Sequence, residues 1–377
     1  MLEQKIKNFE KNLPYKEAPY SKKTWGHPLH SLCSYQGKLK PSIAHWLIKE
    51  FVPDGGSVLD PIGGVGTIPF EAAMLGRRAI SNDKSPFAAT IAKAKLHGIS
   101  RGDFDNVVER YRETISKVSL DDQDYLDTEF GLNAKVKDYF HPDTLETILK
   151  LRKIFLTSSV TDKSSEECFF WACLLHILHG NRPYALSRNS HPITPFAPTG
   201  DFIYKDVFEK IEEKASRALA IDLPNEFTKG EGLWGDFRDV ADKTDTKFDA
   251  IITSPPFYGM RFDRPNWMRL WFCGWKEENF HNESLEFLER QQVKDIGVYK
   301  EFFVMSSKVL KSDGLLIVHL GKGGRRDMSE ELKLLASPEF RFVGEALDCV
   351  KKVAKHGIKD KGMTTAHNLL FFKKINL

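Results

Sequence analysis

Two short segments of this sequence carry residue types that could bind a ligand and act on it. The first is Ser254-Pro255-Pro256-Phe257, which follows an apolar run over residues 248–253. Proline has no N–H to donate to a strand ladder, so we expect a strand to end there and a stiff loop to follow. The loop offers a hydroxyl, a free carbonyl and an aromatic ring at the end of a buried strand, where open α/β sheets bind their ligands. A turn with aromatic packing explains the same residues, so the function of this loop depends on the rest of the chain.

The second segment is a glycine-rich loop over residues 60–67, Asp-Pro-Ile-Gly-Gly-Val-Gly-Thr. A short apolar strand precedes it, a helix is expected over 68–75, and Gly76 favours a helix end. A second strand over 78–82 leads into Asp83, about twenty positions after the loop begins. Glycines let the backbone approach a ligand closely, and an acid at the tip of the second strand is placed to accept from ribose hydroxyls. This unit predicts a bound nucleoside cofactor.

The sequence argues against a nucleoside triphosphate as that cofactor. It contains no GxxxxGK[ST] phosphate loop. Residues 321–326 (GKGGRR) combine glycines with basic residues but lack that spacing. The Asp-Pro pair before the glycines also differs from the usual dinucleotide fingerprint. An ATPase or a dinucleotide-dependent enzyme is therefore disfavoured.

The glycine loop resembles the S-adenosylmethionine loop of amino-methyltransferases, whose usual form is Asp-Pro-Phe-x-Gly-x-Gly-Thr. Ile62 stands here in place of the usual phenylalanine. Ser-Pro-Pro-Phe at 254–257 resembles the catalytic loop of the same superfamily, and each motif supports the other. The chain resembles bacterial DNA amino-methyltransferases over residues 25–100 and 230–375. The resemblance implies an α/β fold built on a Rossmann-like seven-stranded methyltransferase sheet, with S-adenosyl-L-methionine as the cofactor.

Two further segments resemble motifs of these enzymes. Residues 234–239 (WGDFRD) resemble the third motif, in which an acid accepts from the adenine amino group and a neighbouring side chain packs on the ring. Residues 30–38 resemble the N-terminal motif, which closes over the methionine end of the cofactor. The cofactor-binding residues that the resemblance implies are His30, Ser31, Tyr35, Asp60, Pro61, Gly63, Gly64, Gly66, Thr67, Asp83, Asp236 and Phe237.

The same resemblance assigns catalysis to Ser254, Pro255, Pro256 and Phe257. Methyl transfer from a sulfonium to an exocyclic amine is an in-line displacement that needs no metal. If Ser254 Oγ and the Pro255 carbonyl both accept from the amine, its nitrogen is held with the lone pair aimed at the methyl group. Phe257 would stack on a base taken out of the duplex, because the amine cannot be reached inside it. Serine at the first position, rather than aspartate or asparagine, resembles the cytosine-N4 enzymes more than the adenine-N6 enzymes.

Other functions are less consistent with the motifs. Residues 255–261 (PPFYGMR) also resemble the catalytic loop of tRNA guanine-N2 methyltransferases. Those enzymes normally carry an N-terminal RNA-binding domain, whereas the N-terminal motif here begins at residue 30, which favours DNA. A non-catalytic nucleic-acid-binding subunit is disfavoured because Asp60, Asp83 and the Ser-Pro-Pro core are intact. Small-molecule methyltransferases seldom need the rigid Pro-Pro platform.

Residues 101–229 separate the two halves of the motif set and are predicted to form an inserted, mainly helical region for substrate or target recognition. After an apolar helix over 168–180, residues 181–201 show no apolar period and are rich in proline, arginine and amide groups. Such stretches in compact proteins are usually functional or disordered, and an ordered loop without a special role is the alternative. The side chains suited to phosphate or base contacts are Arg182, Tyr184, Arg188, His191, Tyr258 and Arg261.

The overall composition does not indicate nucleic-acid binding, so an argument for it must rest on local basic patches. The 377 residues are 41% hydrophobic and 28% charged, and the formal net charge of +3 is too small to argue for nucleic acid by itself. The lysines of residues 351–374, with Arg325 and Arg326, suit either a basic rim along a phosphate backbone or ordinary protection of edge strands.

Location and organisation follow from the remaining features. Five scattered cysteines without a CxxC pair, the lack of a membrane-length apolar run and a charged N-terminus predict a cytoplasmic protein with reduced thiols. We expect an N-terminal arm over 1–24, a methyltransferase domain over 25–100 and 230–377, and the inserted region 101–229. The predicted partner is double-stranded DNA with the target base flipped, and RNA is the alternative substrate. A restriction or defence-system partner fits the resemblance but is not identified by the sequence, and neither a membrane nor a metal is expected.

Overall fold

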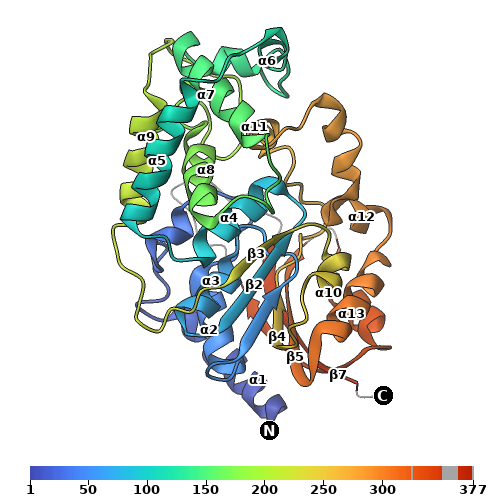
Figure 1. Cartoon of the computed structure of the whole chain (residues 1–377). Coiled ribbons are helices and arrows are strands. Elements are labelled where there is room, and N and C mark those ends of the chain that lie inside the picture. Colours follow the sequence, from blue (N-terminus) through green and yellow to red (C-terminus); the bar gives the residue numbers. More distant parts are fainter. Residues whose placement is uncertain (324–325, 350–363, 376–377) are drawn as a thin grey trace.

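A seven-stranded sheet forms the centre of the molecule (Figure 1). The computed structural model describes residues 1–323, 326–349 and 364–375, so Arg325 and most of the basic stretch predicted at 351–374 lie outside the described residues. The strands are β1 Ser57–Asp60, β2 Arg78–Asp83, β3 Glu231–Trp234, β4 Phe248–Thr253, β5 Leu310–Gly323, β6 Phe340–Cys349 and β7 Thr364–Lys374.

The order of the strands in the sheet is β3-β2-β1-β4-β5-β7-β6. Strands β1 to β5 pair in parallel, whereas β7 runs antiparallel between β5 and β6. This arrangement confirms the predicted fold class, a Rossmann-like seven-stranded methyltransferase sheet with an inserted helical region.

The central strands are apolar on both faces because helices cover both sides of the sheet. Val58 of β1 joins one core together with Ala250 and Ile252 of β4. Leu59 and Ile251, one position along on each strand, belong to the second core. Successive residues of a strand point to opposite faces, so continuous apolar runs are what a sheet buried on both sides requires.

The helices divide between the two cores. Helices α2, α3, α4 and α8 contribute to the first core, and α13 and α14 contribute to the second. The helices are α1 Leu2–Asn12, α2 Pro41–Phe51, α3 Thr67–Met74, α4 Pro86–Leu96, α5 Arg101–Ile115, α6 Asp122–Leu126, α7 Pro142–Phe155, α8 Ser165–Ile177, α9 Val207–Ala218, α10 Val240–Lys243, α11 Trp267–Phe272, α12 Leu288–Lys294, α13 Val298–Val309 and α14 Ser329–Ala336.

The inserted region lies between α4 and β3 in the chain and contains α5 to α9. Figure 1 shows α5, α7, α8 and α9 grouped on one side of the molecule, with α8 against α4. Helix α8 is apolar around most of its circumference, which fits its burial among these neighbours. Among the described helices, none combines the length and apolar composition that crossing a lipid bilayer requires.

The N-terminal segment packs on the sheet. Its helix α1 buries Ile6 and Phe9, which are three positions apart and therefore lie on one helix face. This face contacts β6 at the edge of the sheet. The segment predicted as an arm thus contributes to the first core.

Strands β1 and β4 bring the two motifs together. They are neighbours in the sheet, with Val58 opposite Ala250 and Leu59 opposite Ile251. Because the two strands are parallel, the loops that follow them leave from the same edge. The order of strands reverses between β1 and β4, and this switch point is where open α/β sheets bind ligands.

Candidate active site

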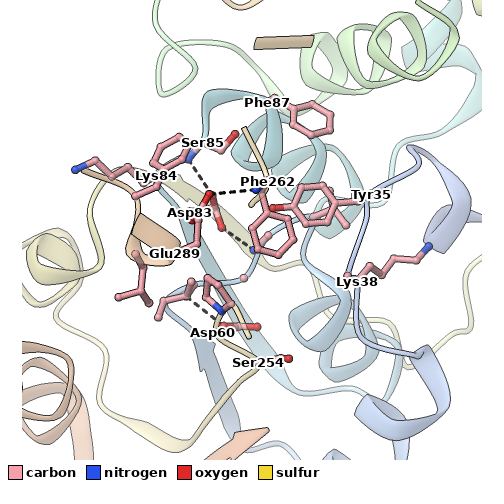
Figure 2. Close-up of a pocket in the computed structure, with 18 of the residues that line it drawn as sticks. Tyr35, Lys38, Asp60, Asp83, Lys84, Ser85, Phe87, Ser254, Phe262 and Glu289 are labelled. Atoms are coloured by element: carbon pink, nitrogen blue, oxygen red, sulfur yellow. Dashed lines mark hydrogen bonds between the residues drawn. The ribbon is translucent and has the colours of Figure 1, made fainter. Parts of the chain in front are cut away.

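A cavity opens at the carboxyl ends of β1 and β4 (Figure 2). It encloses about 1020 Å³ of space, part of it open to solvent. Its wall includes the glycine loop after β1, Asp83 at the tip of β2 and Ser254 after β4. Both predicted motifs therefore face one cavity. The predicted cofactor residues on its wall are Tyr35, Asp60, Pro61, Gly63, Gly64, Thr67, Asp83, Asp236 and Phe237.

The glycine loop lies flat against β2. The Gly63 N–H donates to the carbonyl of Asn82 at 2.8 Å, and a Cβ at Gly63 would overlap Ser81 Oγ. Gly64 has φ +53°, in the left-handed region that favours glycine, and a Cβ there would lie 3.4 Å from the Tyr35 ring. The absence of a side chain lets Gly63 pack against β2, and at Gly64 it leaves space beside the Tyr35 ring on the cavity wall.

Two carboxyls line the glycine loop, of which Asp60 is buried and Asp83 is half-buried. Asp83 accepts from the backbone N–H groups of Gly64 at 2.8 Å and Ser85 at 2.9 Å, and Asp60 accepts from the Ile62 N–H at 3.2 Å. Burial raises the pKa of Asp83 to about 6 and that of Asp60 to about 7. Each carboxylate oxygen has a second lone pair, so Asp83 can still accept from the hydroxyl groups of a ligand.

The loop after β3 forms the opposite part of the wall. Asp236 accepts from Lys84 Nζ at 2.9 Å and from Arg238 Nη1 at 3.0 Å. Phe237 is buried, and the Arg238 guanidinium lies 4.7 Å from the centroid of its ring. An aromatic face and a carboxylate thus adjoin each other, as the predicted adenine site requires.

Tyr35 and Phe262 form another part of the wall. Their rings stack with centroids 5.5 Å apart and planes 10° from parallel. This contact joins the N-terminal motif to the loop that follows the catalytic motif. Lys38 also lines the cavity, but its Nζ donates to the His30 carbonyl at 2.5 Å, and Figure 2 shows the side chain extending away from Tyr35.

Three predicted cofactor residues lie behind the wall. His30 is buried with Nε2 2.5 Å from Glu71 Oε1, and the Ser31 carbonyl accepts from Lys214 Nζ at 2.7 Å. Gly66 begins α3 with φ +69°, which a residue with a side chain rarely adopts. His30 and Ser31 help to fix the N-terminal motif, and Gly66 helps to fix the glycine loop. Contact of these three residues with the cofactor stays a prediction.

Ser254 lines the cavity and has one side-chain partner. Its Oγ lies 2.9 Å from Nδ1 of His319 on β5. Burial lowers the pKa of His319 to about 3, so the imidazole is neutral at neutral pH. Nε2 of His319 has no hydrogen-bond partner among the described residues. The neutral ring can accept the hydroxyl proton on Nδ1 or donate from it, depending on the tautomer.

The Pro-Pro pair is held from the neighbouring helices. The Pro256 carbonyl accepts from Gln292 Nε2 at 3.0 Å, and Gln292 Oε1 in turn accepts from the Tyr299 hydroxyl at 2.9 Å. Pro256 lines the cavity, whereas Pro255 is buried and does not. The loop is therefore fixed by its prolines and by a buried hydrogen-bond chain.

Phe257 packs on β5. Its ring centroid lies 5.7 Å from that of His319, and a Cβ at Gly321 would overlap the ring. The side chain is half-buried and is absent from the cavity wall. Stacking of Phe257 on a flipped base thus stays a prediction, and it would require the ring to turn towards the cavity.

None of the six side chains predicted to contact substrate lines the cavity. Arg188 donates to the carbonyls of Gly200 at 2.7 Å and Asp138 at 3.0 Å, and His191 Nδ1 accepts from the Ile193 N–H at 3.3 Å. These two side chains therefore stabilise the irregular stretch in which they lie.

Of the other four predicted substrate residues, Arg182, Tyr184 and Arg261 have partners within the chain. Arg182 Nη1 donates to the Tyr184 hydroxyl at 2.5 Å. Arg261 pairs with the buried Asp263, and Tyr258 is half-buried beside the catalytic loop. Their contact with a nucleic acid stays a prediction.

Several residues of the site were not identified from the sequence, among them Phe262, His319 and Glu289. His319 lies in the run 314–320 (GLLIVHL), where one histidine in an otherwise apolar strand is a signal that could have been used. Glu289 of α12 lines the cavity, and only the tertiary structure brings it beside the glycine loop.

Comparisons with known proteins match a part of the chain by sequence and most of it by fold. Residues 30–121 match the model of a family described as an RMKL-like methyltransferase domain. A segment of 68 residues is 32% identical to the Type II methyltransferase M.MjaII of Methanocaldococcus jannaschii, and it covers 18% of this chain and 13% of that protein.

Solved structures of other proteins are also similar to this chain, and two of them serve as examples. TrmN from Thermus thermophilus has a TM-score of 0.33 and 13% sequence identity, over 92% of this chain and 52% of that one. The rRNA methyltransferase aviRa from Streptomyces viridochromogenes has a TM-score of 0.34 and 13% identity, over 95% of this chain and 94% of that one.

The segment that matches the family model includes the glycine loop, Asp60 and Asp83, which all face the cavity. The chain contains an S-adenosylmethionine-dependent methyltransferase domain. Its cofactor is S-adenosylmethionine, as predicted from the glycine loop.

The wall of the cavity fits this cofactor. The unsubstituted Gly64 leaves room beside the Tyr35 ring, and Asp83 keeps lone pairs for ribose hydroxyls. The pair Asp236 and Phe237 suits the adenine amino group and ring. When bound, the cofactor supplies a methyl group carried on a sulfonium.

Proposed function

We propose that this protein methylates an exocyclic amino group of a DNA base, with cytosine N4 as the target. The observation that supports the proposal is that Ser254 and the glycine loop, on the adjacent strands β4 and β1, face one cavity. An electrophilic methyl group and a hydroxyl acceptor for an amine would thus meet in the same space. Serine at this position favours cytosine N4, and the 68-residue match to a Type II methyltransferase supports a methyltransferase without indicating the base.

The chemistry that the loop would assist is the orientation of a weak nucleophile. The lone pair of an exocyclic amine is delocalised into the base, so the nitrogen reacts poorly unless it is held towards a tetrahedral geometry. Ser254 Oγ would accept one N–H and the Pro255 carbonyl the other, which requires the carbonyl of the buried Pro255 to become accessible from the cavity. The amine nitrogen then bonds to the methyl carbon while the carbon–sulfur bond breaks and its electron pair returns to sulfur. The methylated cation loses one proton to solvent, which restores the neutral amine.

His319 would act through Ser254 as a positioning residue. If the Ser254 hydroxyl donates to Nδ1 of the neutral ring, both Oγ lone pairs stay available to the amine. The opposite arrangement, with Nδ1–H donating to Oγ, would turn the hydroxyl proton towards the cavity. Acceptance by His319 is therefore the arrangement that the proposed chemistry requires.

Replacing His319 tests this role. We expect His319→Leu to lower kcat about tenfold with the KM for S-adenosylmethionine unchanged, because one orienting hydrogen bond is lost and the apolar volume is kept. His319→Asn presents an acceptor oxygen near the position of Nδ1 and should recover most of kcat. Single-turnover methylation of a DNA duplex measures both variants. Equal slowing in the two would show that the ring only packs against Phe257.

The target base is tested by nucleoside mass spectrometry of a host that expresses the protein. We expect N4-methylcytosine in DNA to rise above the level in an empty-vector control and in a host that expresses Ser254→Ala. A rise in N6-methyladenine would assign the adenine-N6 alternative. New methylguanine in tRNA without a methylated DNA base would overturn the DNA proposal and favour the guanine-N2 alternative suggested by residues 255–261.

A further inference from the structure

Glu289 is an acidic side chain on the cavity wall that neither motif explains. It lies near the start of α12 and is 5% exposed. Its Oε1 accepts from the backbone N–H of Phe262 at 3.3 Å. The neighbouring charges that act most strongly on it are those of Asp263 and Asp83, both acidic. Figure 2 shows Glu289 beside Asp83 on the same side of the cavity.

Acidic groups outnumber basic groups on the wall. The acidic lining residues are Asp60, Asp83, Asp236, Asp263, Glu286 and Glu289, and the basic ones are Lys38 and Lys84. Lys84 is engaged with Asp236 at 2.9 Å, and Lys38 Nζ donates to a backbone carbonyl. Asp263 pairs with Arg261. This leaves Asp60, Asp83 and Glu289 facing the cavity without a salt bridge in the described part of the chain.

The charge of Asp83 disfavours the ionisation of both Glu289 and Asp60. Burial, together with the charges of Asp263 and Asp83, raises the pKa of Glu289 to about 7, and burial with the charge of Asp83 raises the pKa of Asp60 to about 7. A cation in the cavity relieves this repulsion and favours the ionised form of each group. The cavity is therefore suited to a positively charged ligand.

We propose that Glu289 is a cofactor-binding residue that selects the sulfonium cofactor over its neutral thioether product, S-adenosylhomocysteine. The two molecules differ by one methyl group and one positive charge, so a wall with excess negative charge distinguishes them electrostatically. Selection of this kind would help the product to leave after transfer. The proposal rests on the identity of the cofactor and is independent of which nucleic-acid base is methylated.

Calorimetric titration of the full chain with each ligand tests the proposal. In Glu289→Gln we expect the affinity for S-adenosylmethionine to fall about tenfold, because a unit charge close to the ligand in a partly buried site is lost. The affinity for S-adenosylhomocysteine should change by less than about twofold, since that ligand lacks the sulfonium charge. Glu289→Asp, which keeps the charge, should preserve the preference of the wild type.

Glu286→Gln is the matched control, because Glu286 also lines the cavity but its side chain is 62% exposed and lies 4.0 Å from Lys84. Because solvent screens this exposed charge, Glu286→Gln should change either affinity by less than about twofold. Equal weakening of the two ligands in Glu289→Gln, with a lowered melting temperature, would show that Glu289 only holds the Phe262 loop and would overturn the proposal. Failure of the wild type to bind S-adenosylmethionine would instead contradict the assignment of the cofactor.

The pH dependence of binding gives a second readout. A carboxyl with a pKa of about 7 in the free protein is partly protonated at neutral pH, and the cation binds best to its ionised form. The affinity for S-adenosylmethionine should therefore rise as the pH increases through 7, with protons released on binding. Titrations in buffers of different ionisation enthalpy measure that release, which should be smaller in Glu289→Gln and for S-adenosylhomocysteine. An unchanged release in the variant would contradict the role of Glu289.

Discussion

Ser254→Ala is expected to reduce methyl transfer by about a hundredfold or more while leaving S-adenosylmethionine binding almost unchanged. Removing one oriented hydrogen-bonding group next to the reacting atoms costs about two to three orders of magnitude in other enzymes. Ser254 Oγ contacts His319 and no group of the glycine loop, so the cofactor side of the cavity should be unaffected. Single-turnover transfer to DNA and calorimetric binding of the cofactor measure the two effects separately.

Ser254→Asn distinguishes loss of an acceptor from a general disturbance of the loop. Asparagine keeps an acceptor oxygen, so this variant should retain part of the activity. Ser254→Ala also leaves Nδ1 of the neutral His319 without its partner, which is expected to lower stability by about 1 kcal/mol. Full activity in Ser254→Ala would exclude the proposed role of this hydroxyl.

Asp83→Asn is expected to weaken S-adenosylmethionine binding about a hundredfold, as measured by calorimetry. Both carboxylate oxygens accept a backbone N–H, one from Gly64 and one from Ser85. An amide replaces one of these acceptors by a donor, so one backbone N–H of the site loses its partner. The group that would accept from the ribose hydroxyls also loses its charge. Hydrogen bonds to charged groups contribute about 1.5–3 kcal/mol each, which accounts for the expected loss.

Asp249→Asn is the matched control for this variant. Asp249 also lies on a strand of the sheet and accepts from the Ser57 N–H at 2.8 Å, and it pairs with Lys311 at 2.8 Å. It does not line the cavity. We expect it to lower the melting temperature without changing cofactor affinity. If both variants weaken the cofactor equally, the effect of Asp83 is one of stability and not of direct contact.

The sequence by itself determined the local elements around the cofactor. The helix predicted over 68–75 is α3, which spans Thr67–Met74, and the strand predicted over 78–82 is β2, extended by one residue to Asp83. Apolar runs, glycines in a loop and a glycine at a helix end act through neighbours in the chain, so they can be recognised from the order of residues. The sequence also predicted that the glycine loop and Ser-Pro-Pro-Phe belong to one site, because both segments resemble motifs of the same enzyme superfamily.

Only the tertiary structure decided which groups complete the site. His319 reaches Ser254 because β5 lies beside β4, and Glu289 reaches the cavity because the chain after the catalytic loop folds back over the glycine loop. The Phe257 ring packs against His319 of β5. Arg188 and His191 form hydrogen bonds within their own loop. Each of these contacts joins atoms whose separation is set by strand order and helix packing. The motifs therefore identify the cofactor and the Ser254 loop, while the charge of the cavity and the partner of its hydroxyl depend on the three-dimensional arrangement.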